Sequence, residues 1–139
     1  MLSRVADNLY WFGRYLQRAE NTARLINVHA NLLLDLPRNL TVGWLPLLEI
    51  AGADGLFKTT GMEPTEDNVV RFLIVDERNP GAIFSSLDFA REIARVSRDC
   101  MPREAWERLN DLFLFVQERG ERSVSRARRQ DFLQGVING

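Results

Sequence analysis

The N-terminal quarter of the chain repeats apolar residues at alternating steps of three and four, which restricts its fold more than any other feature. The repeat contains Leu2, Val5, Leu9, Phe12, Leu16, Ala19, Ala23, Ile26, Ala30 and Leu33. An α-helix turns by about 100° per residue, so this spacing places all of them on one stripe of a single helix. The sequence predicts that this helix begins at about Ser3, a suitable N-cap, and ends near Leu34, before Asp35-Leu36-Pro37.

The rest of the chain contains further segments with helical spacing. The first is a short apolar segment around Trp44 to Ile50, in a helix that would begin at Thr41. The others are Thr65 to Val75, Asn79-Pro80 to Met101, Pro102 to about Gly120, and Val124 to Ile137. Residues 52–64 are rich in Gly and Thr and are expected to form a loop. The sequence therefore predicts an all-α fold: one domain, residues 1–139, folded as a bundle of five or six helices.

One of these segments also fits a strand. Residues 69–75 are mostly β-prone, but no second run of that kind exists to pair with them. Thr65 is a good N-cap, and Glu66 and Asp67 would lie near the positive end of a helix dipole. A helix is therefore the better interpretation of this segment.

The helix that follows Asn79-Pro80 is expected to lie at the centre of the bundle. Its apolar stripe contains Ile83, Leu87, Ala90, Ala94, Ser97 and Met101, and it is widened by Phe89, Ile93 and Val96. Its small residues match the small residues Ala19 and Ala23 of the first helix, and small faces let two helices approach closely. We expect these two helices to pack against each other.

Composition excludes several classes of function. The net charge of −1 gives no general attraction to nucleic acid or to an anionic membrane surface. No segment approaches the roughly 18 apolar residues of a membrane span, and the amphipathic start is unlike a signal peptide. A cytoplasmic location is therefore expected.

Metal and covalent chemistry have few possible ligands and nucleophiles in this chain. His29 is the only histidine and Cys100 the only cysteine, which excludes paired Glu-x-x-His sites, HExxH, CxxC and any internal disulfide. We expect a structural role for His29 and a buried position for Cys100 at a helix end. No Gly-rich phosphate loop occurs. The sequence predicts no catalytic residue, no metal and no cofactor.

A group of polar residues borders the two apolar stripes and is the main candidate site. Glu20 lies about 40° from Leu16, at the edge of the first stripe, and a carboxylate there needs a partner. If the two helices pack together, Glu20 would lie within reach of Arg91 or Arg98. The predicted polar cluster consists of Glu20, Arg24, Gln17, Arg91, Arg95 and Arg98. It either fixes helix register as a salt-bridge network or forms a pocket for an anionic or amide-bearing ligand.

Two surface features are less specific. The basic run Arg119, Arg122, Arg126, Arg128 and Arg129 is expected to form a solvated helix face, with an acidic partner as the alternative. Tyr10, Trp11 and Tyr15 lie on the border of the first helix opposite Glu20. They are expected to serve ordinary packing, but an exposed Trp11 would indicate an interface.

The same residues resemble a known family. The segment Met1–Arg24, MLSRVADNLYWFGRYLQRAENTAR, closely resembles the start of bacterial alpha-E domain proteins, and residues 79–92 and 106–110 are similar to later parts of that family. Gln17 departs from the pattern, because family members usually have glutamate at this position. Members are usually longer, with a second helix like the first. The resemblance thus implies that residues 1–139 form a short member or an N-terminal half.

The resemblance also implies a function. Alpha-E proteins are typically fused to or associated with circularly permuted ATP-grasp ligases, and are associated with transglutaminase-like peptidases. We therefore expect a non-catalytic accessory or scaffold domain beside an ATP-grasp amide ligase. The alternatives are a ligand-binding or metal-free enzymatic domain, with a Glu/Arg pocket in which Glu20 is the general acid/base, and a homo-oligomer built through the first helix.

Overall fold

A computed structural model of the chain describes residues 2–35, 43–124 and 126–138, and within these ranges it contains helices but no strand. The helices are α1 (Leu2–Asp35), α2 (Leu45–Ile50), α3 (Asp54–Thr59), α4 (Glu66–Ile74), α5 (Ile83–Val96), α6 (Arg103–Arg119) and α7 (Arg126–Asn138). Short 3-10 turns at Arg98–Cys100 and Arg122–Val124 precede α6 and α7. The predicted all-α bundle with a long N-terminal helix is confirmed. None of the described helices is long and apolar enough to cross a membrane.

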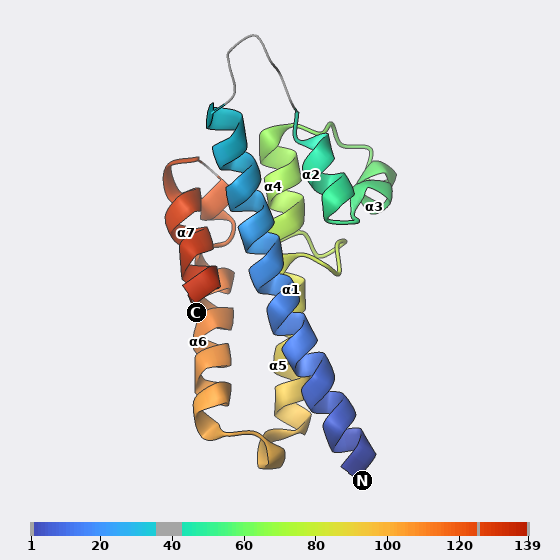
Figure 1. Cartoon of the computed structure of the whole chain (residues 1–139), viewed down its shortest axis with the longest axis vertical. Coiled ribbons are helices and arrows are strands. Elements are labelled where there is room, and N and C mark those ends of the chain that lie inside the picture. The colour runs from blue at the N-terminus through green and yellow to red at the C-terminus, as the bar shows by residue number, and fades with distance from the viewer. Residues whose placement is uncertain (1, 36–42, 125, 139) are drawn as a thin grey trace.

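The long helix α1 is the spine of the molecule. Figure 1 shows α1 running the length of the bundle, with α5 and α6 beside its N-terminal half and α2, α4 and α7 around its C-terminal half. Among the described helices, α1 and α5 make the most extensive contact, and α7 packs against α1 as well. Both ends of the bundle are therefore built on the same helix.

Helices α1 and α5 pack against each other, as predicted, and small residues of both helices are buried. Ala19 and Ala23 of α1 and Ala90 and Ala94 of α5 are all buried. Near the N-terminal end of α1, Asn8 Nδ2 donates a hydrogen bond of 2.9 Å to Ser97 Oγ, just beyond the end of α5. Small side chains let the two helix backbones approach closely, so this seam fixes the position of α1.

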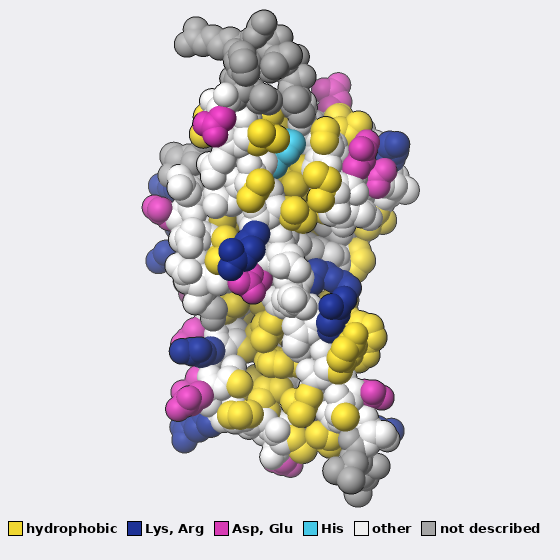
Figure 2. Space-filling view, in the orientation of Figure 1, with side chains coloured by type: hydrophobic (Ala, Val, Ile, Leu, Met, Phe, Trp, Pro, Cys, Tyr) yellow, Lys and Arg dark blue, Asp and Glu magenta, His cyan; other side chains and the backbone are white. Residues whose placement is uncertain are grey.

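The apolar stripe of α1 is fully buried only in its middle. Ile26 is buried with Ala19 and Ala23, whereas Phe12 and Leu16 are half-buried and Leu9 is exposed. Figure 2 shows hydrophobic side chains gathered between α6 and the N-terminal half of α1. Since α7 packs on the C-terminal half of α1, the N-terminal half is left more open.

Two segments differ from the sequence prediction around residues 43–64. The segment expected as a loop contains α3, which lies between Gly52 and Gly61, both with left-handed backbone (φ 71° and 73°). The buried Phe57 anchors α3, because its ring meets that of Phe72 edge-on at 5.1 Å. This tertiary contact has no periodic signal in the sequence. The start predicted at Thr41 lies outside the described residues, and α2 begins at Leu45.

Helix α5 begins at Ile83 rather than at Asn79-Pro80. Asn79 instead forms a turn, in which its carbonyl accepts from Ala82 N (3.1 Å) and its Oδ1 accepts from Gly81 N (3.0 Å). Its Nδ2 donates to the Phe72 carbonyl of α4 at 3.0 Å. The asparagine is therefore occupied in joining α4 to α5 and does not cap a helix.

The other element predictions hold, with exceptions in side-chain exposure. Thr65 caps α4 by accepting from Asn68 N at 3.3 Å, so the choice of helix over strand is confirmed. Phe89 and Val96 do not widen the buried face of α5, because both are exposed. Cys100, expected to be buried, is also exposed.

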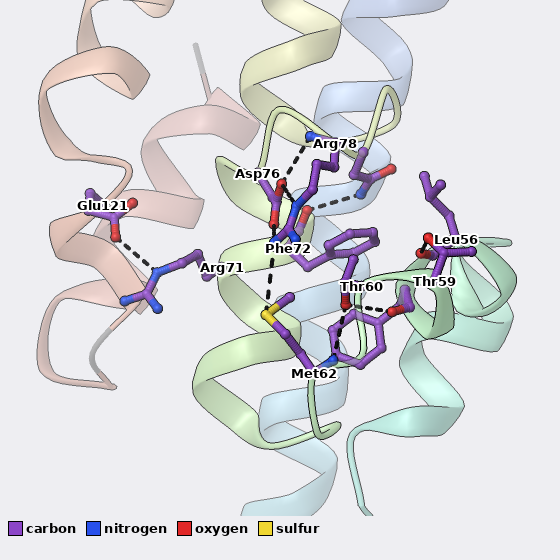
Figure 3. A network of polar contacts seen from close by, with 11 residues as sticks. Leu56, Thr59, Thr60, Met62, Arg71, Phe72, Asp76, Arg78 and Glu121 are labelled. Atoms are coloured by element: carbon purple, nitrogen blue, oxygen red, sulfur yellow. Dashed lines mark hydrogen bonds and ion pairs between the residues drawn. The ribbon is translucent and has the colours of Figure 1, made fainter.

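A polar network surrounds the C-terminal end of α4 (Figure 3). Arg71 Nε donates to Glu121 Oε1 at 2.9 Å, which links α4 to the turn before α7. Arg78 holds Asp76 with its side chain, from Nε to Oδ1 at 3.0 Å and from Nη2 to Oδ2 at 2.7 Å, and with its backbone N–H. The hydrogen bonds from the Arg78 side chain are the main reason that the pKa of Asp76 lies below its ordinary value of 3.8.

Candidate functional site

The predicted polar cluster is brought together only in part. Glu20 Oε1 accepts from Arg24 Nη2 at 2.8 Å, in the expected i,i+4 arrangement on α1. The two side chains are 39% and 56% exposed, respectively. An exposed ion pair of this kind contributes about 0–1 kcal/mol to stability. The pair is therefore a surface feature rather than part of the core.

Arg91 and Arg95 of α5, and Arg98 in the 3-10 turn that follows it, have other partners. Arg91 lies over the Phe113 ring at 4.4 Å and Arg98 over the Trp106 ring at 5.2 Å, both on α6. Arg95 pairs with Glu92 on its own helix at 2.9 Å. The predicted contact of Glu20 with Arg91 or Arg98 is not among the ion pairs of the described residues. Because α5 meets α1 through Ala90 and Ala94, Arg91 lies on the flank of α5 that faces α6.

Gln17 lies in a third place. Together with Arg14, Arg18 and Asn21 it lines a shallow hollow of about 260 Å³ between α1 and the end of α2. Its exposed side chain makes no hydrogen bond among the described residues. The six residues predicted as one cluster are thus divided between α1, which carries Gln17, Glu20 and Arg24, and the segment facing α6, where Arg91 and Arg98 lie on α6 rings.

The structure contains a buried polar site that the sequence prediction missed, centred on Arg129. The Arg129 side chain is only 7% exposed, and its Nη2 donates to Glu66 Oε1 at 3.1 Å. The guanidinium carbon lies 5.4 Å from the centre of the Trp44 ring. The expectation that the basic run forms a solvated face is therefore wrong at Arg129, although Arg119, Arg122 and Arg128 are exposed.

Trp44 is also contacted by His29 of α1. The two rings meet edge-on at 4.8 Å, and His29 Nε2 lies 3.0 Å from the Gly43 carbonyl oxygen, to which it can donate. His29 is buried, consistent with the structural role expected for it. These contacts fix the start of α2 against α1, and with it the wall on which Arg129 rests.

A signal in the sequence does place Arg129 inside the bundle. Phe132, Leu133 and Val136 follow it by three, four and seven residues, and all three are buried. That spacing puts Arg129 on the apolar stripe of α7 rather than on its polar face. Arg129 is close in sequence to the other arginines of the basic run, but its helical position differs from theirs.

Arg129 forms one wall of a cavity of about 190 Å³ that Glu66, Trp44, Asn27, Asn31 and Gln130 also line. Arg129 Nη1 is buried and has no hydrogen-bond partner among the described residues. The cavity thus combines a guanidinium, a carboxylate and amide side chains, which is suited to binding a small polar ligand. Among the described residues, no group of three or more His, Cys, Asp or Glu side chains is arranged to hold a metal ion.

These features define an all-α bundle domain built on one long amphipathic helix, with a buried arginine–glutamate pair joining the first turns of α4 and α7. The chain belongs to the Alpha-E family, described as a predicted alpha-helical domain with a conserved ER motif, and the match covers residues 1–139. Glutamate directly precedes arginine at residues 77–78, 107–108, 118–119 and 121–122, and glutamine precedes arginine at residues 17–18. No curated protein and no solved structure matches the chain.

Proposed function

We propose that this chain is a non-catalytic accessory domain that docks onto an ATP-grasp-type amide ligase in the cytoplasm. The observation that carries this proposal is a continuous surface of aromatic rings along α1 and α5, which we name the aromatic strip. It consists of Tyr10, Trp11, Tyr15 and Phe89. Ring centroids are 5.4 Å apart for Tyr10–Trp11, 6.1 Å for Trp11–Tyr15 and 5.2 Å for Tyr15–Phe89.

The aromatic strip is open to solvent. Tyr10 is 59% exposed, Trp11 47% and Phe89 42%. Tyr and Trp are enriched at the centres of protein interfaces, because they bury a large area while losing few rotatable bonds. From the sequence, an exposed Trp11 would indicate an interface, and Trp11 is exposed. This supports docking of a partner protein on the aromatic strip.

An apolar groove lies on the other flank of α1. Phe12 and Leu16 face Leu109 and Leu112 of α6 across a hollow of about 440 Å³. Helix α7 does not extend to this end of α1 (Figure 1), and hydrophobic side chains gather on this half of the molecule (Figure 2). Strip and groove together leave both sides of the N-terminal half of α1 available to one partner.

The class of partner is supported by the family rather than by the surface. The resemblance to alpha-E proteins implies association with an ATP-grasp ligase and with a transglutaminase-like peptidase. Both classes act on amide bonds, so a helical domain that binds either protein would organise an amide-forming or amide-cleaving complex. We favour the ligase, and self-association through α1 is the competing use of the same surface.

The proposal is tested by titrating the purified chain with each ATP-grasp ligase of the source organism in a calorimeter. Trp11→Glu should weaken the complex by at least about tenfold, as the loss of an interface hot spot does. Val28→Glu is the matched control, because Val28 is also an exposed apolar residue of α1 and lies outside the strip. Both variants should keep the parent melting temperature.

Three results would refute the proposal. They are binding to none of the ligases, equal weakening by the two variants, and binding of the peptidase alone. A fourth refuting result could come from sedimentation of the chain at several concentrations. A dimer that Trp11→Glu dissociates would assign the aromatic strip to self-association instead.

A further inference from the structure

The cavity beside Arg129 lies far from the aromatic strip. Asn27 and Asn31 of α1 line it, whereas Phe12 and Leu16 line the apolar groove. From Leu16 to Asn31 the distance along α1 is about 22 Å, at 1.5 Å per residue. A ligand in this cavity would therefore be separate from a partner docked on the strip, and each can be tested without the other.

Arg129 is one of the residues that line this cavity, and its guanidinium has a hydrogen-bond donor without a partner among the described residues. Its Nη2 is bonded to Glu66 Oε1, and its face rests on the Trp44 ring. Its Nη1 is buried without a partner among the described residues, although the side chain is more than nine-tenths buried. Leaving a buried donor of a charged group unsatisfied is costly, and the missing partner must be a hydrogen-bond acceptor.

Amide side chains supply the rest of the polar lining. Asn27 and Asn31 are one turn apart on the same face of α1, and Gln130 is the residue after Arg129 on α7. None of the three makes a side-chain hydrogen bond among the described residues. Each amide offers donors and an acceptor, so the cavity can hydrogen-bond a second polar group on the ligand.

The size and charge of the cavity restrict the ligand. Its volume of about 190 Å³ is below the roughly 300–1,000 Å³ of pockets for drug-sized molecules. Guanidinium groups bind carboxylates and phosphates best, because their N–H donors match two oxygens. Glu66 lies against the same guanidinium and would repel a dianionic phosphate more strongly than a monoanionic carboxylate.

We propose that this cavity binds a carboxylate group, with Arg129 Nη1 as the primary donor and the amides of Asn27, Asn31 and Gln130 hydrogen-bonding the next polar group of the ligand. The carboxylate belongs either to a free amino acid or to the C-terminus of a peptide. Trp44 forms the apolar wall, and Glu66 holds the guanidinium in position.

The test uses glycine, diglycine, acetate and diglycine amide as probes, with nuclear magnetic resonance of the tryptophan indole N–H groups as the readout. Trp44 lines the cavity, whereas Trp11 and Trp106 lie elsewhere and serve as internal controls. The Trp44 signal alone should shift and saturate with acetate, glycine and diglycine. Diglycine amide, which lacks the carboxylate, should not shift it. Tighter binding of diglycine than of glycine would identify a peptide C-terminus, and the reverse a free amino acid.

Two variants locate the binding. Asn31→Ala should weaken the binding of the tighter probe roughly two- to tenfold, the fold-change that one net hydrogen bond corresponds to. Asn21→Ala, an exposed asparagine of α1 outside this cavity, should leave it unchanged. Arg129→Lys keeps the charge but loses the planar fork, and should weaken binding at least about tenfold with unchanged Trp11 and Trp106 signals.

The proposal is overturned by any of three results. The first is a Trp44 signal that does not saturate with any carboxylate probe, which would show that the cavity does not bind a carboxylate. The second is a shift of that signal with diglycine amide as strong as with diglycine. The third is equal binding of the probe by Asn31→Ala and Asn21→Ala. The ligand would then lie outside the Arg129 cavity, even if Arg129→Lys weakened its binding.

Discussion

At the scale of single residues, Arg129 and Glu66 form the least exposed ion pair given for the described residues. It connects the first turn of α4 to the first turn of α7, two helices about sixty residues apart in the chain. A buried guanidinium requires a counter-charge, because its removal from water is unfavourable. The exposed pair of Glu20 and Arg24 has the same chemistry but no such requirement.

This contrast predicts different losses of stability for two equivalent substitutions. Glu66→Gln should lower the free energy of unfolding by about 1–3 kcal/mol, less than for a fully buried pair because Glu66 is 21% exposed. Glu20→Gln should lower it by about 0–1 kcal/mol. Urea unfolding followed by circular dichroism measures both. Equal losses would mean that Arg129 has sufficient other partners.

Asp76 gives the stability a dependence on pH. Its folded-state pKa lies below its ordinary value of 3.8 because Arg78 hydrogen-bonds the ionised form. A lowered pKa means that the folded state favours loss of the proton, so the contribution is fully present well above pH 3.8 and is lost as the pH falls through the folded-state pKa.

We therefore expect Asp76→Asn to be less stable than the parent at pH 7 and to approach the parent as the pH is lowered below 3.8. Thermal unfolding at a series of pH values checks this. A difference between parent and variant that stays constant across the series would assign the effect to packing or to a hydrogen bond that does not depend on charge.

At the scale of elements, hydrophobic periodicity predicts those helices whose extents are set by local sequence. It fails where a single tertiary contact determines whether a helix forms or where it begins. The extents of α1, α4 and α6 follow from stripes, a Thr65 cap and proline or glycine at their ends. By contrast, α3 depends on Phe57 meeting Phe72, and the start of α5 depends on Asn79 reaching the Phe72 carbonyl. Neither partner can be identified from local sequence.

The candidate site was predicted less well than the helices for a related reason. A stripe shows which face of a helix is buried but not which neighbour each flank will meet. Arg91 borders the buried stripe of α5, yet it contacts α6, as does Arg98 in the turn after α5. Arg129 could be placed inside the bundle from its spacing to Leu133, but its pairing with Glu66 required the structure.

The end of α6 provides a test of packing between elements. A Cβ at Gly120 would lie 2.6 Å from the Val116 carbonyl oxygen and 2.6 Å from Val75 Cγ1. Gly120→Ala should therefore destabilise the protein by about 1–3 kcal/mol, the usual cost of overpacking. Gly13→Ala is the control, since a Cβ there meets nothing within 4 Å.

Gly13→Ala should stabilise the protein by about 0.5–1 kcal/mol, because alanine is favoured over glycine in a helix interior. Melting temperatures of the two variants should thus move in opposite directions. A rise for Gly120→Ala would mean that α6 can shift away from α4 without loss of packing.

At the scale of the whole molecule, α1 joins two ends of different character. Its N-terminal half presents the aromatic strip and the apolar groove, and its C-terminal half lines the polar cavity at Arg129. Local opening is easier where few side chains are buried, so the two halves of α1 should differ in hydrogen exchange.

Backbone amides of residues 6–13, none of which is buried, should therefore exchange faster than those of residues 20–27, where Thr22, Ala23 and Ile26 are buried. Hydrogen exchange followed by mass spectrometry on peptides from these two ranges makes the measurement. Uniform protection along α1 would indicate that the N-terminal half is covered in solution, and dilution of the sample would then reveal whether a second copy covers it.

The alanine seam between α1 and α5 also has a consequence for sequence variation among relatives. Ala19, Ala23, Ala90 and Ala94 are all buried, so a larger residue at any of them would have to displace its neighbours or push the two helices apart. Separation would displace the strip, the groove and the cavity together, because all three are built on α1. Related chains should therefore keep small residues at these four positions, whereas exposed positions of the same two helices can vary in size.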